Sequence, residues 1–472
     1  MDNNHPSATT RLHDIVRFPW WTSPNLLMLL SLAVVLYVIV AVDDAQYKRW
    51  GTPRYVTTVE AVEIGAVIIA VLLGIVVGMV LGRRTKQSYF QETELFLRTR
   101  ILTVLFYFFV LLTLAGYVIW IVKASQNGAT ITAVMATLRG DPGAVSELKE
   151  VAQPQAGLTT LTQFGVLVVV LGIVRARVTG KSATILVWLV IMLSLLRFFL
   201  YAERIAFLEV AVPAMMVLVS LWPPNSRYPR TRKFMIAIAP VLLAALAFGL
   251  FALGEYFRSW AFVREESEQS FTEFIVSRFL SYYATATNNG VLYGRLADEH
   301  NLNQTAFYIL YNLPGSPLGN GDVAGTEFNR WWGLQLELFA NPSLTNIGTV
   351  FPLIGEISLV TVLFLFFIQA LVFALLYSKA KNGHFISMLV IPVFCFASLE
   401  LPRISYLLLG RSAPIFLGVI VVWFVFDIWR ACGCGRAPEE SVSTSRPPRH
   451  RKASGEDVAP DVPDRYQAVF RE

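Results

Sequence analysis

Residues 277–290 read SRFLSYYATATNNG and form a polar interruption in a chain dominated by leucine, valine and alanine. Arg278, Tyr282 and Asn289 recur there at helical spacing, which predicts that they project from one side of a helix. A tyrosine ring stacks on a sugar, an amide binds sugar hydroxyls, and a guanidinium binds two phosphate oxygens at once. The segment therefore predicts a site for a phosphorylated sugar. The alternative is an amphipathic helix that packs its aromatic side chains on the membrane domain, with Arg278 paired to an acid.

The flanking residues predict where this helix begins and ends. Ser270 and Glu273 match a capping box, so we expect the helix to begin directly after Ser270. Asn288, Asn289 and Gly290 tolerate the left-handed backbone of a helix end, so we expect the helix to stop there.

Arginines also flank the turns between hydrophobic segments. A guanidinium at bilayer depth costs roughly 2.5–3.5 kcal/mol on insertion scales, so it is expected to have a partner or a function. Snorkelling to the lipid headgroups is the alternative for any single arginine. Several cations at one depth, however, predict a membrane-embedded anion such as the diphosphate of a lipid carrier. The arginines expected at this outer level are Arg197, Arg204, Arg278, Arg295, Arg403 and Arg411.

Three acids and one histidine accompany these arginines. Glu203 and Glu209 are expected to form ion pairs with them. Glu356, in FPLIGEIS, is expected either to act as a base on an acceptor hydroxyl or to neutralise an arginine. His300, in ADEHNLNQ, is expected to be solvated rather than catalytic. The sequence has no metal-ligand spacing and no Walker, GxGxxG or GxSxG motif, so we expect neither a metal nor a cofactor.

The composition indicates which solvent surrounds the elements that carry these residues. Of the 472 residues, 55% are hydrophobic and only 15% are charged, and the mean hydropathy is +0.55. A soluble chain of this length needs more charge to cover its surface, so a bilayer is the expected solvent. The net charge of +6 is spread over short loops, which argues against nucleic-acid binding. The three cysteines cannot form a disulfide framework, and Cys432 and Cys434 are expected to be a reduced cytosolic pair.

Apolar runs of spanning length recur along the chain and predict an all-α fold, a polytopic bundle of about ten transmembrane helices. The expected spans are 24–42, 58–82, 101–122, 159–176, 183–201, 205–222, 234–254, 351–378, 385–402 and 412–429.

Loop charge predicts the orientation of this bundle. Short loops rich in Lys and Arg stay cytoplasmic, and every even-numbered loop here is short and basic. Ten crossings with both termini in the cytoplasm satisfy that rule. The loops 43–57, 123–158 and 255–350 then face out. The resulting divisions are a cytoplasmic segment 1–23, helices in 24–254, a helical outer loop 255–350, helices in 351–430 and a disordered cytoplasmic tail 431–472.

Two outer loops are expected to carry helices of their own. The 123–158 loop is long enough for a small surface helix. In the longer loop, Phe328, Trp332, Leu336 and Phe339 share a face at helical spacing, which predicts a helix that lies in the outer headgroup region.

With these features in view, the chain resembles bacterial O-antigen polymerases, the oligosaccharide repeat-unit polymerases. The resemblance covers about residues 24–430 and rests on YAERIAFLEVAVP, SRFLSYYATATNNG and NPSLTNIGTVFPLIGEIS. It implies a metal-independent glycosyltransferase of the C-type superfamily at the outer face of the bacterial cytoplasmic membrane. Such an enzyme moves a growing glycan from undecaprenyl diphosphate onto the terminal sugar of a new lipid-linked repeat unit.

The resemblance also implies roles for single residues. Arg204 and Arg278 correspond to the family's functional outer-face arginines, with Tyr282 and Asn289 in the same motif. Where family members show Asp-Phe-Gly-like residues before the helix after the long loop, this chain has Glu356. The expected catalytic residues are Arg204, Arg278 and Glu356. The expected substrate-binding residues are Arg197, Tyr282, Tyr283, Asn288, Asn289, Arg295, Arg403 and Arg411.

Two other functions stay open. An O-antigen ligase-like transferase joins finished glycan to a lipid or protein, and His300 is the residue that discriminates it from a polymerase. A lipid-linked oligosaccharide flippase is the alternative from another class, although transporters show paired repeats and midplane charges. The expected partners are the undecaprenyl-diphosphate-linked oligosaccharide as donor and acceptor, membrane lipids and a chain-length regulator, with no nucleic acid.

Overall fold

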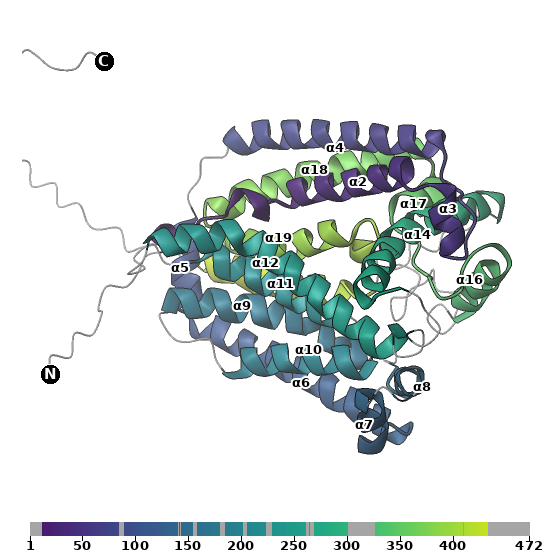
Figure 1. Cartoon of the computed structure of the whole chain (residues 1–472). Helices are drawn as coiled ribbons and strands as arrows, with labels where there is room; N and C mark the ends of the chain where they lie inside the picture. Colours follow the sequence, from purple (N-terminus) through teal and green to yellow (C-terminus); the bar gives the residue numbers. More distant parts are fainter. Residues whose placement is uncertain are drawn as a thin grey trace, which may run out of the picture. The chain divides into compact units, whose positions relative to one another are not determined.

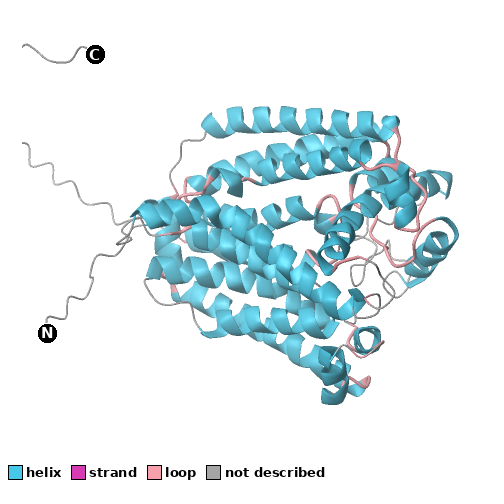
Figure 2. Ribbon diagram, in the orientation of Figure 1, coloured by secondary structure: helices cyan, strands magenta, loops and turns pink. Residues whose placement is uncertain are grey.

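The regular structure of this protein is helical (Figures 1 and 2), and no strand occurs among the described residues. The chain divides into two units, 1–435 and 436–472, and all described residues belong to the first. The computed structural model describes residues 12–84, 89–139, 141, 143–153, 158–179, 185–201, 205–222, 229–260, 264, 269–300, 326–408 and 410–432.

Seven helical segments in this part of the chain are long and apolar enough to cross a bilayer, which indicates a membrane protein. They are α2 (Pro24–Ala41), α4 (Thr58–Arg84), α6 (Arg100–Gln126), α9 (Phe164–Thr179) with the preceding turn η2 (Leu158–Gln163), α12 (Pro229–Glu255), α18 (Leu359–Lys381) and α20 (Ala413–Ala431).

Three shorter apolar helices occupy the remaining expected spans, so all ten expected segments are helical. Whether these three also cross the bilayer stays a prediction. They are α10 (Ile185–Tyr201), α11 (Ile205–Ser220) and α19 (Phe385–Glu400). From Phe164 to Val174 the helix α9 is apolar all round and buried, as expected of the central helix of a bundle.

The other elements are short helices and the two helices of the long loop. They are α1 (Leu12–Ile15), η1 (Trp20–Thr22), α3 (Asp44–Arg49), α5 (Phe90–Leu97), α7 (Ile131–Arg139), α8 (Ala144–Val151), the π-helix η3 (Tyr256–Trp260), α14 (Phe271–His300), α16 (Thr326–Phe339), α17 (Val350–Ile357) and η4 (Tyr406–Leu408). The expected surface helix in 123–158 is thus present as α8, with α7 before it.

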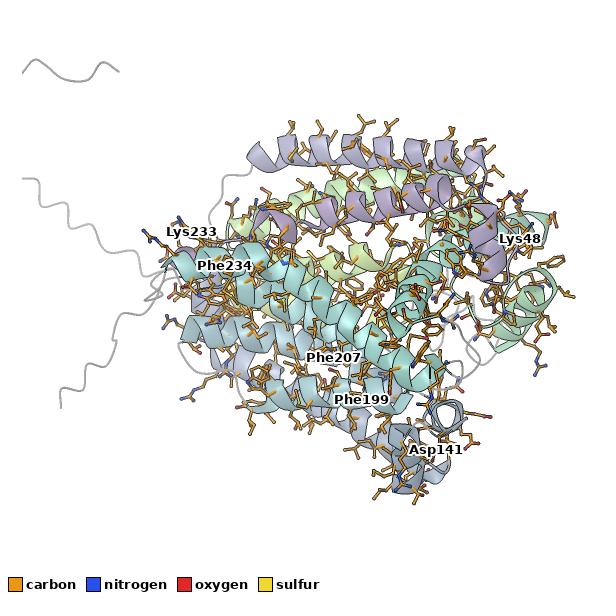
Figure 3. All side chains as sticks on the ribbon, viewed as in Figure 1. Lys48, Asp141, Phe199, Phe207, Lys233 and Phe234 are labelled. Atoms are coloured by element: carbon orange, nitrogen blue, oxygen red, sulfur yellow. The ribbon has the colours of Figure 1, made fainter. Side chains whose placement is uncertain are left out.

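The loops that are expected outside gather at one end of the helices. Figure 1 shows α3, α7, α8, α14, α16 and α17 toward this end and α5 at the other, and Figure 3 shows Lys48 and Asp141 far from Lys233. The described residues of two short basic loops, α5 and Lys233, therefore lie at the end of the bundle opposite the long loops. Which end faces the cytoplasm stays a prediction from loop charge.

A stripe of glycines on α4 packs closely against α18. Gly74, Gly78 and Gly82 recur every four residues on α4 and face α18. A Cβ on Gly78 would lie 2.6 Å from the Ala374 Cβ, so a larger residue would separate the two helices. Small residues let helices approach closely where lipid removes the hydrophobic driving force for association.

The helix α14 begins as the capping box predicts, but it does not end where predicted. The Ser270 amide donates to Glu273 Oε2 at 2.9 Å, and the Glu273 amide donates to the Ser270 hydroxyl at 3.3 Å. The helix then runs through Asn288 and Gly290 to His300, so the predicted stop at 288–290 is wrong. The physical reason is packing: a Cβ on Gly290 would clash with the Ile347 carbonyl oxygen, so glycine serves close approach and not a helix end.

The expected span 351–378 is broken into α17 and α18. Ser358 lies between them with φ 84° and ψ 152°, a backbone region that is essentially restricted to glycine. Such strain costs on the order of 1–3 kcal/mol and persists only where the surroundings enforce it. Here α17 packs along α14 through Gly294 and Gly355, and the chain must turn sharply at Ser358 to continue into α18.

Part of the apolar face of α16 is covered by protein. Trp332 and Leu336 are buried against Tyr293 of α14, so these two residues contact protein. The location of α16 in the headgroup region stays a prediction. Phe339, the last residue of the predicted face, is exposed, as are Leu334 and Leu338 on other sides of α16. Trp332 and Leu336 are buried because α14 is longer than predicted and presents Tyr293 to them.

The glycine contact between α14 and α17 gives a test of the fold. Gly355→Ala would force a methyl group into the Gly294 backbone, so we expect the free energy of unfolding to fall by about 1–3 kcal/mol. Thermal unfolding of the detergent-solubilised protein measures this. Gly333→Ala in α16 is the matched control, because a Cβ there meets no atom within 4 Å. Equal melting temperatures for both variants would contradict the tight contact.

Candidate functional site

Glu209 of α11 is the centre of a buried polar cluster. Arg411, which precedes α20, donates from Nε to Glu209 Oε2 at 3.3 Å and from Nη2 to Oε1 at 3.2 Å. The Tyr406 hydroxyl donates to Oε2 at 3.4 Å. When the Gln163 side-chain amide is oriented with its nitrogen toward Glu209, this nitrogen donates to Oε1 at 2.8 Å. The predicted ion-pair role of Glu209 is therefore present in the structure.

Arg197 of α10 joins the same cluster through η2. Its Nη1 donates to the Thr162 hydroxyl at 2.8 Å, and the side chain is only 5% exposed. Thr162 is followed by Gln163, which contacts Glu209. Two adjacent residues of η2 thus link Arg197 to the polar cluster that contains Glu209 and Arg411.

A second ion pair lies on the other side of Tyr406. Arg403 donates to Glu400 Oε2 from Nε at 2.8 Å and from Nη2 at 2.6 Å. Burial lowers the pKa of Arg403, but Glu400 and Tyr283 raise it by more, so the net direction is upward. Arg403 is therefore a permanent cation beside the tyrosines of α14.

Tyr406 connects the two ion pairs. Burial and the Glu209 carboxylate raise the pKa of the Tyr406 hydroxyl, and Glu400 acts in the same direction. The hydroxyl therefore stays protonated and donates to Glu209. Tyr406 thus lies near two carboxylates, Glu209 and Glu400, which pair with Arg411 and Arg403. Arg197 is linked to the Glu209 group through Thr162 and Gln163. Arg197, Arg403 and Arg411 are three of the predicted substrate-binding residues.

Arg278 is paired to an acid, as the alternative interpretation of its helix predicts. Its Nε lies 3.5 Å from Oε2 of Glu255, a fully buried carboxylate at the end of α12 that also accepts from Ser259 at 2.7 Å. One turn farther along α14, the Tyr282 ring meets Phe251 edge to face at 5.5 Å. Both predicted residues therefore fasten α14 to α12, next to Tyr283 and Arg403.

Asn288 and Asn289 bind backbone groups of neighbouring loops. Asn288 Oδ1 accepts from the Tyr55 amide at 2.6 Å, and its Nδ2 donates to the Pro53 carbonyl at 2.8 Å. Asn289 Nδ2 donates to the Leu344 carbonyl at 2.6 Å. Both side chains are buried, so in this structure they hold loops in place instead of presenting amides to a sugar.

Arg295 and Glu356 lie apart from the arginine cluster. Arg295 is 13 residues beyond Tyr282 on α14, about 20 Å along the helix, and its Nη2 donates to Glu60 of α4 at 3.0 Å. Glu356 accepts from the Tyr293 hydroxyl at 2.6 Å and lies near the C-terminal end of α17. Arg403 lies near the other end of α17, where its carbonyl accepts from the Gly348 amide. The six arginines expected at one level therefore do not all converge.

Some predicted residues lie outside the described part of the chain. They are Glu203, Arg204 and the side chain of His300.

The sequence reasoning missed the neutral partners of the cluster, Thr162, Gln163 and Tyr406, as well as Glu255. The available signal was weak: polar residues in LTTLTQFG and RISYLLLG at the ends of apolar runs. In the described ranges, no three His, Cys, Asp or Glu side chains gather in a way that would hold a metal.

The arrangement combines cations, carboxylates and a neutral hydroxyl in a place that is largely shielded from water. Arg403 and Arg411 each contact a carboxylate through the Nε and Nη2 edge, and such forks also bind phosphate. An anion would compete with Glu209 and Glu400 for these groups. Comparison with protein-family models, with curated proteins and with solved structures gives no match.

The ion pair of Glu209 with Arg411 is the central pair of the cluster, and removing one member tests whether this pair is buried. Glu209→Ala leaves Arg411 without its carboxylate in a buried place, so we expect a loss of about 3–5 kcal/mol in the free energy of unfolding. The neutral double variant Glu209→Gln with Arg411→Gln should lose much less. Chemical or thermal unfolding measures both.

The control for this test is Asp44→Ala, which breaks an exposed pair with Arg54 and should change stability by only about 0–1 kcal/mol. If Glu209→Ala is as mild as this control, the central pair is not buried as described.

Proposed function

We propose that this protein is a glycosyltransferase that joins oligosaccharide repeat units carried on a polyprenyl diphosphate, at the outer face of the bacterial cytoplasmic membrane. The observation that carries the proposal is the pair of arginine–carboxylate groups near Tyr406, Arg403 with Glu400 and Arg411 with Glu209, with Arg197 linked to the second group through Thr162. These cations lie toward the end of the bundle where the long loops gather, and Arg403 lies beside the tyrosines of α14. A diphosphate that leaves in such a place is stabilised by cations that are already oriented.

An apolar pocket beside the cluster supports a lipid-linked substrate. It has a volume of about 250 Å³, and Tyr406 lines it together with Leu353 of α17 and Leu365 of α18. Leu365 and Ile368 are partly exposed on a candidate spanning helix, so the pocket borders the surface expected to face lipid. A hydrocarbon chain fits there, while its charged end reaches toward Tyr406 and the arginines.

The proposed reaction is a displacement at the anomeric carbon of the donor glycan. An acceptor hydroxyl oxygen forms the new bond to that carbon, and its proton passes to a base. The bond from carbon to the diphosphate oxygen breaks, and the electron pair leaves with the diphosphate. As the diphosphate binds, it takes the place of Glu400 at Arg403 and of Glu209 at Arg411. Each carboxylate releases one edge of its guanidinium, and that edge then binds the diphosphate.

A charge-balanced pair of substitutions tests the role of the arginines. Arg403→Gln with Glu400→Gln removes a cation and its carboxylate together, so no charge is left buried alone. We expect normal amounts of protein in the membrane but a loss of long glycan chains by at least tenfold. Gel ladders of surface glycan from a deletion strain that carries the variant measure this.

The matched control is Arg295→Gln with Glu60→Gln, the same exchange at an ion pair far from the cluster. It should keep the normal ladder. A normal ladder from the Arg403 and Glu400 variant would contradict the proposal. Elongation of lipid-linked units by the reconstituted protein separates a polymerase from a flippase, which would move them without joining them.

A further inference from the structure

Glu356 and Tyr293 form a second polar site at a distance from the arginine cluster. Tyr282 and Tyr293 are 11 residues apart on α14, about 16 Å along the axis and on the same face of the helix. The segment that leads into α17 lies at the Arg403 turn, where the Gly348 amide donates to the Arg403 carbonyl at 3.0 Å. Glu356 is near the opposite end of that helix. Both helices therefore separate Glu356 from the cations by more than the width of one sugar ring.

The local structure holds the Glu356 carboxylate in one position. The Tyr293 hydroxyl donates to Glu356 Oε1 at 2.6 Å, and Tyr293 itself is fully buried among the aromatic residues of α16. Burial and the Glu356 carboxylate raise the pKa of Tyr293, so its hydroxyl remains a donor. Glu356 is only partly buried, so the residue is both held in place and in contact with solvent.

Two features of this site oppose folding stability, and a third brings its residues together. A carboxylate near a helix C-terminus meets the negative end of the helix dipole. Ser358, two residues later, has a strained backbone. Tyr293 reaches Glu356 only because Gly294 and Gly355 bring α14 and α17 into backbone contact. Strain that surrounds an accessible, fixed side chain is typical of functional sites.

A second aromatic ring lies beside Tyr293, the residue that holds the carboxylate. The Trp331 ring centre is 6.3 Å from that of Tyr293, and the Trp331 side chain is only partly buried. A planar ring with a neighbouring hydrogen-bond acceptor suits a saccharide, whose faces are apolar and whose rim carries hydroxyl donors. Phosphate is disfavoured, because the fixed group is itself an anion.

We propose that Glu356, Tyr293 and Trp331 form a distal saccharide subsite, which rests on the proposed function and binds a sugar of the donor glycan several rings away from the diphosphate. Glu356 accepts hydroxyl hydrogens of that sugar, and Tyr293 is a positioning residue that fixes the carboxylate. No bond forms or breaks there. The subsite makes the enzyme favour donors long enough to span from the arginine cluster to Glu356.

Steady-state kinetics of the full-length protein in nanodiscs test this subsite with two donors. One is the polyprenyl-diphosphate-linked repeat unit isolated from the producing bacterium, and the other is the same molecule trimmed to its first sugar. For Glu356→Gln and Tyr293→Phe we expect KM for the complete donor to rise about tenfold, with kcat within twofold of wild type. The trimmed donor cannot reach Glu356, so its kcat/KM should not change.

Tyr47→Phe is the matched control, because it removes another buried tyrosine hydroxyl that contacts α14, through the Ala284 carbonyl at 3.4 Å. It should leave both donors unaffected. A fall in kcat at unchanged KM would overturn the subsite, since Glu356 would then act at the reacting atoms. Equal losses with both donors would also overturn it and indicate a structural role. If the wild-type protein joins no units at all, the proposed function fails, and the subsite fails with it.

Discussion

The Glu209 carboxylate connects four chain segments, because each of its buried partners comes from a different part of the sequence. Gln163 belongs to η2, Tyr406 to η4, and Arg411 to the turn before α20. A charge taken out of water needs a partner with good geometry, and removal of either member is far more costly than replacement of both. This electrostatic requirement places the end of the helix bundle in a definite arrangement. The same requirement applies to the proposed function, in which a substrate anion takes the place of a carboxylate that is already bound.

The helix α14 links this end of the bundle to several other elements. Arg278 and Tyr282 near its start contact α12, Asn288 in its middle holds the segment before α4, and Tyr293 contacts α16 and α17. A single helix of 30 residues therefore sets the spacing between the arginine cluster and Glu356. Proposed substrate contacts at both places then depend on one rigid element, whose length does not change when loops move.

Much of the fold was predictable from local patterns. Apolar runs predict the helical segments, and the capping box predicts the start of α14, because both effects act within a few residues. The end of α14, the break at Ser358 and the buried face of α16 were not predictable, since each depends on contacts with distant segments. Asn288 illustrates the difficulty: an asparagine that ends a helix and one that holds a loop look the same in a sequence.

The candidate site was predictable only in part, for a related reason. Charge placement predicts arginines near one end of the bundle, and Arg197, Arg403 and Arg411 do share a cluster there. Glu400 lies only three residues before Arg403, so that pair is visible in the sequence. Glu209, the partner of Arg411, comes from another helix, so spacing along the chain cannot reveal that pair. Glu255 is the clearest case, because it lies in a different helix from Arg278 and has no motif around it.

The glycine stripe between α4 and α18 has a different physical character from the charged end of the bundle. Its contacts join backbone and small side chains, such as Ala374 and Ser378, and include no group that gains or loses a proton near neutral pH. The molecule thus consists of a part whose cohesion depends on paired buried charges and a part whose cohesion depends only on how closely two backbones can approach.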